Sequence, residues 1–527
     1  MLSRLRSALL GLQTRWRLSS LARRVARGSN PSAEKAVIFF NASARLQGLS
    51  LNAAFALLAA WGLRLAGVRV VHFVCKSGMS RCVLGTNRDD HTAAPPCTAC
   101  IAQSRRLYAG AEVRWFGYRE DAELAATLLG LSLDQLSVIN YQGLPLGELV
   151  LPSLRWILRR HHLQDDEPTR FLMREYILSA YHVGREFDAL LDQTNPMAVV
   201  VFNGIMYPEA MARRVAQKRG VRVITHEVAF QPFSAFFTEG EATAYPIHIP
   251  EDFELSSEHN ARLDAYLRNR FQGDFTMAGI RFWPEMRGLD EAFLAKAQGF
   301  KHILPVFTNV IFDTSQVHAN TVFPHMFAWL DLILELMRAH TETLFVIRAH
   351  PDEMRPGTLK QSRESVRQWV DDRGVASLHN VVFIDSHEYV SSYALIQRSK
   401  FVMVYNSSIA LEATLLGVPV LCGGRARFTQ YPIVFFPDSP AAYRQKAEEF
   451  LAAERIALPS EFARNARRFL YYQLFKTGLP FGRFLNTHPR PGFVALKRFD
   501  MDDLSSQNAP AIRAIYGGVV NGEDFLV

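Results

Sequence analysis

Residues 401–422 read FVMVYNSSIALEATLLGVPVLC, and this stretch decides the fold class. Phe401–Tyr405 is an apolar run ended by Asn-Ser-Ser, Ser408–Leu416 has the length and spacing of a helix, and Val418–Cys422 is a second apolar run. A short buried strand, a helix and another strand indicate a βαβ unit. Such units build parallel sheets that are covered by helices.

The same alternation continues on both sides of this unit. In the second half we expect strands at His302–Thr308, Thr343–Arg348 and Val381–Ile384, and helices at Thr321–Ala339 and Ser391–Arg398. In the first half we expect strands at Ala36–Asn41, Val68–Val74, Ala198–Phe202 and Val221–Thr225, and helices at Leu51–Leu65 and Pro208–Arg219. The sequence therefore predicts an α/β protein with two Rossmann-like domains facing across a cleft.

A length of 527 residues suits two such domains. We expect five parts, which are a basic amphipathic N-terminal arm (1–30), an N-terminal Rossmann-like domain with a Cys-rich loop at 75–100 (31–253), a helical connection (254–300), a C-terminal Rossmann-like domain (301–440), and C-terminal helices with a tail (441–527).

The basic residues are concentrated at the N-terminus. The chain has 59 Lys and Arg against 51 Asp and Glu, a formal charge of +8. Residues 1–30 hold seven arginines and no acidic residue, so the rest of the chain carries only +1. Proteins that bind nucleic acid spread Lys and Arg over the binding face. The neutral body therefore argues against a nucleic-acid partner.

The N-terminal arm has the pattern of an interfacial helix. A helical projection places Leu2, Leu5, Leu9, Leu12 and Trp16 on one side, with arginines opposite and beside them. This pattern suits an anionic membrane surface and predicts a peripheral protein at the cytoplasmic face of the membrane. A solvated terminus and a mitochondrial transit peptide are the alternatives. No segment is long and apolar enough to cross a bilayer.

Four of the five cysteines are clustered in the sequence, at Cys75, Cys82, Cys97 and Cys100. The last two stand in Pro-Pro-Cys-Thr-Ala-Cys, a short turn that can place two thiolates on one metal. Four thiolates suit a structural zinc or iron–sulfur site. Unligated thiols and disulfides are the alternatives.

Polar side chains follow three expected strands of the second half, namely Asn309 and Asp313, then Arg348 and His350, then Asn406, Ser407 and Ser408. Carboxyl ends of parallel strands meet at one edge, so we expect these residues in one cleft. The helix start at Ser408 offers backbone N–H groups to an anion, and Glu412 can accept hydrogen bonds from sugar hydroxyls. Singly, each residue also fits a structural role, such as a serine N-cap. Together they indicate a phosphate and ribose site.

Two common nucleotide motifs are missing from the sequence. No G-x-G-x-x-G follows the first strand of either half, and no G-x-x-x-x-G-K-[ST] occurs. Dinucleotide oxidoreductases and P-loop enzymes are therefore disfavoured.

On these residues the sequence resembles bacterial GT-B glycosyltransferases that use CMP-activated sugars, and most of all the capsule polysaccharide biosynthesis proteins, which include Kdo transferases. His350-Pro351 and Ser407-Ser408 are similar to the HP and SS motifs of that family, within roughly residues 300–425. The resemblance implies a GT-B fold and a CMP-, UDP- or GDP-linked sugar donor. It also implies that His350, Ser407 and Ser408 hold the nucleotide phosphate and that Glu412 holds the ribose or sugar. The same motifs are similar to those of CDP-glycerol polymerising transferases.

Sugar transfer also needs a group that deprotonates the acceptor hydroxyl. The expected strand Val221–Thr225 ends in His226-Glu227, so Glu227 is the candidate base and His226 the alternative, unless both are structural. Asn203 and Glu209, after the preceding strand, are expected acceptor contacts. No acidic pair of the D-x-D kind stands in the cleft segments, so we expect no metal at the donor.

The sequence thus predicts a glycosyltransferase that moves a sugar from a nucleotide donor to a surface polysaccharide or a lipid-linked acceptor. A nucleotide-sugar epimerase, which shares the two-domain fold, is one alternative. A non-catalytic membrane assembly factor is another.

Overall fold

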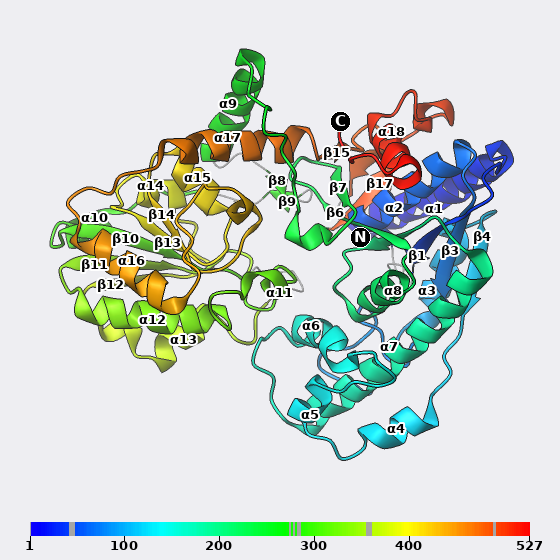
Figure 1. The fold of residues 1–527 in the computed structure, drawn as a ribbon, viewed down its shortest axis with the longest axis horizontal. Helices are drawn as coiled ribbons and strands as arrows, with labels where there is room; N and C mark the ends of the chain where they lie inside the picture. Colours follow the sequence, from blue (N-terminus) through cyan, green and yellow to red (C-terminus); the bar gives the residue numbers. More distant parts are fainter. Residues whose placement is uncertain are drawn as a thin grey trace.

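The computed structural model describes residues 2–41, 48–272, 276–277, 280–281, 286–354, 361–488 and 492–527. Figure 1 shows two halves side by side, each built around one large sheet. One mostly parallel and one fully parallel sheet confirm the predicted α/β class and its pair of Rossmann-like units.

The N-terminal half contains a seven-stranded sheet in the order β15-β7-β6-β5-β1-β3-β4. The strands are β1 (Val37–Asn41), β3 (Val70–Cys75), β4 (Glu112–Phe116), β5 (Ala198–Phe202), β6 (Arg222–Val228), β7 (Ser234–Thr238) and β15 (Leu479–Pro480). The five strands from β4 to β6 are parallel, while β7 and β15 add an antiparallel edge.

Both faces of this sheet are buried, as the apolar strands require. In β1, Val37 and Phe39 pack in one core with α1 (Leu2–Gly28) and α2 (Leu51–Leu65). The alternate residues Ile38 and Phe40 pack in the opposite core. The helices there are α6 (Leu146–Leu158), α7 (Glu167–Thr194) and α8 (Tyr207–Lys218). Other helices of this half are α3 (Cys97–Leu107), α4 (Ala122–Leu128) and α5 (Leu133–Ser137).

The C-terminal half contains a fully parallel five-stranded sheet in the order β12-β11-β10-β13-β14. Its strands are β10 (His302–Phe307), β11 (Thr343–Arg348), β12 (Val381–Ile384), β13 (Val402–Val404) and β14 (Val420–Cys422). The helices around it are α10 (Glu291–Ala297), α11 (Gln316–Ala319), α12 (Met326–Ala339), α13 (Val366–Asp372), α14 (Ser392–Ile396), α15 (Ile409–Leu415) and α16 (Pro440–Ala452). The chain enters at β10, builds outward to β12, then reverses at β13. Ligands of such sheets bind at this reversal.

Two helices and several short strands connect the halves. The predicted helical connection contains α9 (Ser257–Phe271) and the hairpin β8 (Thr276–Met277) and β9 (Ile280–Arg281). In Figure 1, α17 (Ser460–Phe475) runs from the C-terminal half toward the N-terminal half. The chain then adds β15 to the N-terminal sheet and packs α18 (Pro510–Tyr516) against α2. A small sheet joins β2 (Leu49–Ser50), β16 (Leu485–Thr487) and β17 (Phe493–Leu496).

The C-terminal tail therefore completes the N-terminal domain, which the predicted boundary at residue 441 does not show. Its apolar residues are too scattered for a periodic pattern because they fill gaps beside α2.

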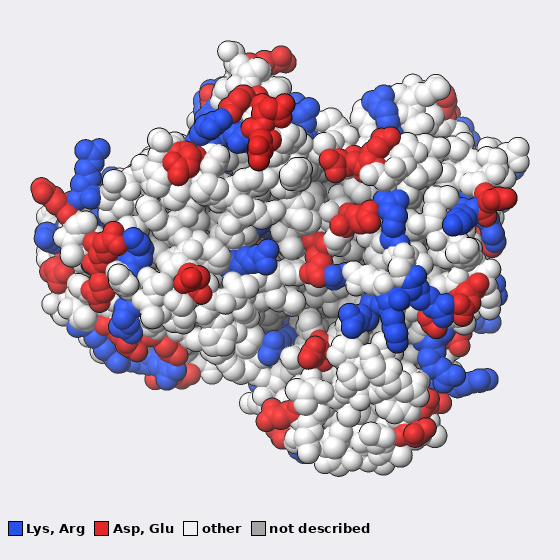
Figure 2. All heavy atoms as spheres, in the orientation of Figure 1, with Lys and Arg blue, Asp and Glu red and all other residues white. Residues whose placement is uncertain are grey.

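Figure 2 shows Lys and Arg interspersed with Asp and Glu over both halves of the face drawn, and a hollow between the halves.

The predicted N-terminal arm is only partly separate from the fold. Leu18, Leu21, Ala22 and Val25 of α1 are buried in the core with α2. Trp16, only two residues before Leu18, has 70% of its surface exposed. The second half of α1 is therefore a structural part of the N-terminal domain.

We predict that Leu18→Ala lowers the free energy of unfolding by about 2–5 kcal/mol, because it removes buried methyl groups and leaves a cavity. Trp16→Ala, at an exposed position of the same helix, is the control and is expected to change it by less than about 0.5 kcal/mol. Urea denaturation measures both values. Equal, small effects would show that α1 is not docked.

Candidate functional site

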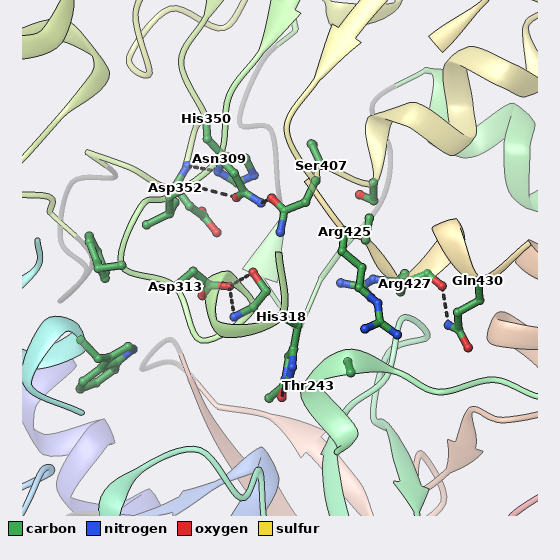
Figure 3. A pocket seen from close by; sticks show the side chains of 18 of the residues that line it. Thr243, Asn309, Asp313, His318, His350, Asp352, Ser407, Arg425, Arg427 and Gln430 are labelled. Atoms are coloured by element: carbon green, nitrogen blue, oxygen red, sulfur yellow. Dashed lines mark hydrogen bonds between the residues drawn. The ribbon is translucent and has the colours of Figure 1, made fainter. Parts of the chain in front are cut away.

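A cavity of about 290 Å³ opens at the strand reversal of the C-terminal sheet, and we call it the main cavity because most of the predicted donor-side residues line it. Asn309 follows β10 and Asn406 follows β13, and Asn309 Nδ2 donates a 2.5 Å hydrogen bond to Asn406 Oδ1. Figure 3 shows the lining side chains pointing toward one another from several loops. The polar and charged ones are Thr243, Asn309, Asp313, Ser315, His318, His350, Asp352, Asn406, Ser407, Ser408, Arg425, Arg427 and Gln430.

A second cavity of about 110 Å³ lies on the other side of the same loops. His350, Asp352, Ser407 and Ser408 line both cavities. Arg270, Arg348, Tyr393 and Glu412 line only the smaller one. The structure therefore brings all the predicted donor-side residues to these two adjoining spaces.

His350 has a defined hydrogen-bond role. Its Nδ1 accepts a 3.1 Å hydrogen bond from the backbone N–H of Asp352. In the neutral ring the proton is therefore on Nε2, which makes that nitrogen a donor. A donor of this kind suits a phosphate oxygen.

The serines line the cavities, but the helix after them differs from the prediction. The helix α15 has only seven residues, so its dipole is short. The N–H groups of Ala410 and Leu411 bond the carbonyls of Ser407 and Ser408 at 3.2 and 3.1 Å. The Ser408 side chain makes no capping hydrogen bond. The amides of Ala410 and Leu411 are therefore used within the helix, while Ser407 and Ser408 themselves line the cavities.

Glu412 is held more tightly than the sequence suggested. Its Oε1 accepts a 2.6 Å hydrogen bond from Arg270 Nε, and its Oε2 accepts one of 2.6 Å from the Tyr393 hydroxyl. The side chains of Arg270 and Glu412 are only 7% and 4% exposed. Glu412 therefore forms a buried ion pair that positions Arg270, instead of facing a sugar with unoccupied oxygens.

Two other predicted donor residues are also fixed by local bonds. Arg348 is buried and donates a 2.5 Å hydrogen bond from Nη1 to the Asp385 carbonyl, and burial lowers its pKa to about 10. Asp313 Oδ2 accepts a 2.7 Å hydrogen bond from the Ser315 hydroxyl. Arg348 keeps its charge at neutral pH beside the smaller cavity, and Asp313 lies beside the larger one.

Glu227, the predicted base, lies on β6 at the carboxyl edge of the N-terminal sheet. Its oxygens accept hydrogen bonds from Asn52 at 3.1 Å, Asn203 at 2.8 Å and the Val228 amide at 2.8 Å. Burial raises its pKa above the ordinary value. Asn203 adopts a left-handed backbone with φ of 61°, a strained conformation that the Asn203–Glu227 bond helps to hold. Asn203 thus positions Glu227.

His226 and Glu209 lie inside the domain. Strand alternation turns His226 away from Glu227, and its ring stacks on Phe237 with centroids 5.0 Å apart. Burial lowers the pKa of His226 to about 3. Glu209 is buried in the first turn of α8, where burial raises its pKa to about 8. Neither lines the two cavities, which is also true of Glu227, so His226 and Glu227 both stay predictions for the base.

The described residues give no support to the predicted metal site at the cysteines. No group of three or more His, Cys, Asp or Glu side chains within the described ranges is arranged to hold a metal ion. None of Cys75, Cys82, Cys97 and Cys100 takes part in a disulfide. Burial raises the pKa of Cys75 and Cys82 to about 12 in the metal-free chain.

Sequence reasoning missed several cavity residues. Arg425 and Arg427 follow β14 in Gly423-Gly-Arg-Ala-Arg, and a Cβ on Gly424 would lie 3.1 Å from the Tyr405 ring. Two arginines that follow a strand and two glycines form a sequence pattern that could have indicated site residues. No sequence pattern indicates Thr243 and His318, because 75 residues separate them and only folding brings them together.

Comparisons with known proteins give one family match. Residues 285–447 match the family model described as capsule polysaccharide biosynthesis protein. The match covers the C-terminal sheet and the loops after β10, β11 and β13 that line the two cavities. It confirms the predicted resemblance to capsule polysaccharide biosynthesis proteins. A search of curated proteins found no match.

Solved structures similar to this chain have low sequence identity and low TM-scores. One is KpsC of Thermosulfurimonas dismutans, described as a beta Kdo 2,4 transferase, with 10% identity, 59% of this chain and 87% of that chain covered, and a TM-score of 0.34. Another is UDP-GlcNAc 2-epimerase from Neisseria meningitidis, with 13% identity, 83% and 98% covered, and a TM-score of 0.25. Scores this low carry no argument about the site.

The buried Arg270–Glu412 pair gives a stability prediction. Arg270→Met leaves the Glu412 carboxylate buried without its cation and is expected to lower the free energy of unfolding by about 3–5 kcal/mol. Arg464 and Glu254 form an exposed ion pair, with side chains 58% and 54% exposed. Arg464→Met is therefore expected to cost at most about 1 kcal/mol. Similar losses in both variants, measured by denaturation, would contradict the structural role of the buried pair.

Proposed function

We propose that this protein, a glycosyltransferase of capsule polysaccharide synthesis by the family match over residues 285–447, is a GT-B-type enzyme that uses a nucleotide-activated sugar. The observation that carries the proposal is the cavity at the strand reversal, where hydroxyls, amides and cations converge. A CMP-linked sugar is the first candidate donor, since the HP and SS motifs resemble those of CMP-sugar enzymes.

The charges around the cavity favour a phosphate-bearing donor. Arg425, Arg427 and His350 supply donors, and the hydroxyls of Ser407 and Ser408 face the same space. Guanidinium groups bind phosphate oxygens through paired N–H donors. We assign the donor phosphate to these groups, and with it the stabilisation of the leaving group during transfer.

The two domains divide the substrates in this proposal. Residues 301–440 form the nucleotide-sugar domain, and residues 31–253 form the acceptor domain. Trp156 and Thr243, which precede the connection, line the cavity from the acceptor side. Glu227 is a candidate for the base that activates the acceptor, with Asn203 positioning its carboxylate.

A thermal-shift screen tests the donor. At a sugar-nucleotide concentration of about 100 Kd, binding stabilises the folded protein by about 2.7 kcal/mol, which corresponds to a rise in Tm of about 2–5 °C for a chain of this size. CMP, CDP, UDP, GDP and their sugars form the panel. Ser408→Ala and Arg425→Met are expected to reduce the shift.

The control for the screen is Arg444→Met, which removes an arginine paired with Glu335 on the surface of the same domain and should leave the shift unchanged. No shift with any nucleotide would contradict the proposal and favour an assembly factor. Isomerised sugar nucleotide, released without an acceptor, would identify an epimerase instead.

We further propose that the first half of α1 contacts an anionic membrane surface. None of the helices in the described ranges is long and apolar enough to cross a membrane. The support is the apolar stripe of the sequence, the adjacent arginines and the exposed Trp16, fixed to the body by the docked second half of the helix.

Vesicle co-sedimentation tests this contact. Binding to phosphatidylglycerol vesicles should exceed binding to phosphatidylcholine vesicles and fall with added salt. Trp16→Ala and the double variant Arg4→Gln/Arg6→Gln should each weaken it several-fold. Leu129→Ala, at a position 71% exposed elsewhere on the same domain, is the control. Equal binding to both vesicle types would contradict the contact.

A further inference from the structure

We infer that His318, held by Glu241, is the general base that deprotonates the acceptor hydroxyl. This inference rests on the proposed function and deepens it. It assigns a catalytic role to a side chain of the cavity wall that no sequence motif marked.

Three side chains lie in a row at the edge of the main cavity. The Thr243 hydroxyl lies 2.8 Å from His318 Nε2, and His318 Nδ1 lies 3.2 Å from Glu241 Oε2. The other Glu241 oxygen pairs with Arg213. Thr243 and Glu241 lie in the segment before the domain connection, and His318 lies in α11 of the C-terminal half.

This arrangement sets the protonation state of the imidazole ring. Glu241 pairs with Arg213 and also lies beside Nδ1, so it favours the tautomer whose proton is on that nitrogen. The lone pair of Nε2 then accepts the Thr243 O–H. A histidine oriented by a carboxylate at one nitrogen, with a hydroxyl at the other, is arranged as a base for an alcohol.

The position of His318 in the cavity fits an acceptor site. Thr243 and His318 line the same space as Ser407 and His350, which we assign to the donor phosphate. Figure 3 shows Thr243 and His318 together at one end of the pocket, His350 and Ser407 at the other, and Asp313 and Arg425 between them. A sugar whose phosphate lies at one end therefore presents its anomeric carbon toward His318.

The acceptor hydroxyl takes the place of the Thr243 hydroxyl at Nε2 and gives its proton to the neutral ring. The acceptor oxygen bonds the anomeric carbon, and the bond from that carbon to the phosphate oxygen breaks with its electron pair on the phosphate. The imidazolium then releases its proton to water.

Glu227 is less suited to this step. Three donors already occupy its oxygens, and Glu227 is not among the residues that line the main cavity. His318 in contrast faces that cavity with a single hydroxyl partner at Nε2.

The charged groups around His318 predict its pH dependence. Burial lowers the pKa of the ring, Glu241 raises it, and Arg213 and Arg425 lower it, with a net decrease below the ordinary value near 6.5. The ring is neutral at pH 7, and the transfer rate should rise with pH through an acidic limb below 6.5 and stay level above it.

The test measures nucleotide release from CMP-, UDP- and GDP-linked sugars between pH 5 and pH 9. His318→Gln is expected to lower the rate by about 10²–10⁴-fold and to remove the acidic limb, while the nucleotide thermal shift persists. Added imidazole should partly restore the rate of His318→Ala. Glu241→Gln should slow release and move the limb to lower pH, because it removes the partner that raises the pKa.

His340→Gln is the matched control. His340 Nε2 lies 2.7 Å from Glu448, and its side chain is 22% exposed, close to the 18% of His318. This variant should show the same rate of nucleotide release and the same acidic limb of the pH profile as the unchanged protein.

The outcomes separate this inference from the proposed function. A full rate in His318→Gln, or a loss found in Glu227→Gln but not in His318→Gln, overturns the inference and leaves the donor site standing. Binding of a sugar nucleotide without any release also overturns it. Failure of every sugar nucleotide to bind overturns the proposed function, and the inference with it.

Discussion

The hydrogen bond between Asn309 and Asn406 marks the constraint on which the site depends. The chain enters the C-terminal sheet at β10 and builds to one side before it returns to the other side at β13. Loops that leave in opposite directions must separate there, and the gap between them becomes a crevice. The two asparagines join the loops that carry Asp313 and Ser407 around this crevice.

Charged side chains in the cleft are held in place by direct contacts with oppositely charged partners. Arg270 and Glu412 are buried together, and Glu241 lies between Arg213 and His318. Such pairs fix side chains that otherwise sample many rotamers, and a partner that is removed leaves an uncompensated charge. The surface shown in Figure 2 carries both signs interspersed, so the order in the cleft comes from these contacts and not from a broad field.

Much of the fold was predictable from the sequence. Apolar runs of four to six residues between helices predicted most of the parallel strands, and β10, β11 and β14 end within one residue of their expected ends. The long α7 and the tail that completes the N-terminal sheet were not predicted. The tail adds one short strand and one short helix to a distant surface, and such pairing leaves no local periodicity.

The candidate site, like the fold, was predictable from the sequence only in part. Residues at strand ends were visible because a strand end is a local pattern, and Asn309, Asp313, His350, Asn406, Ser407 and Ser408 all line the main cavity. Their partners were not visible. Glu412 was expected to face a sugar, but Arg270, 142 residues away, occupies it. The four cysteines were expected to share a metal, but the described residues show no group arranged to hold one and no disulfide between the cysteines.

By itself, the sequence determined the two parallel sheets, the strand ends that carry polar residues and the neutral body with a basic N-terminal helix. These properties follow from neighbours along the chain, through apolar periodicity and the residues that interrupt it. Only the tertiary structure decided which polar groups meet. Contacts such as Thr243 with His318, or Asn203 with Glu227, depend on the strand order and on the packing of one half against the other. Spacing in the sequence does not encode these distances, because the intervening segments fold into elements of their own.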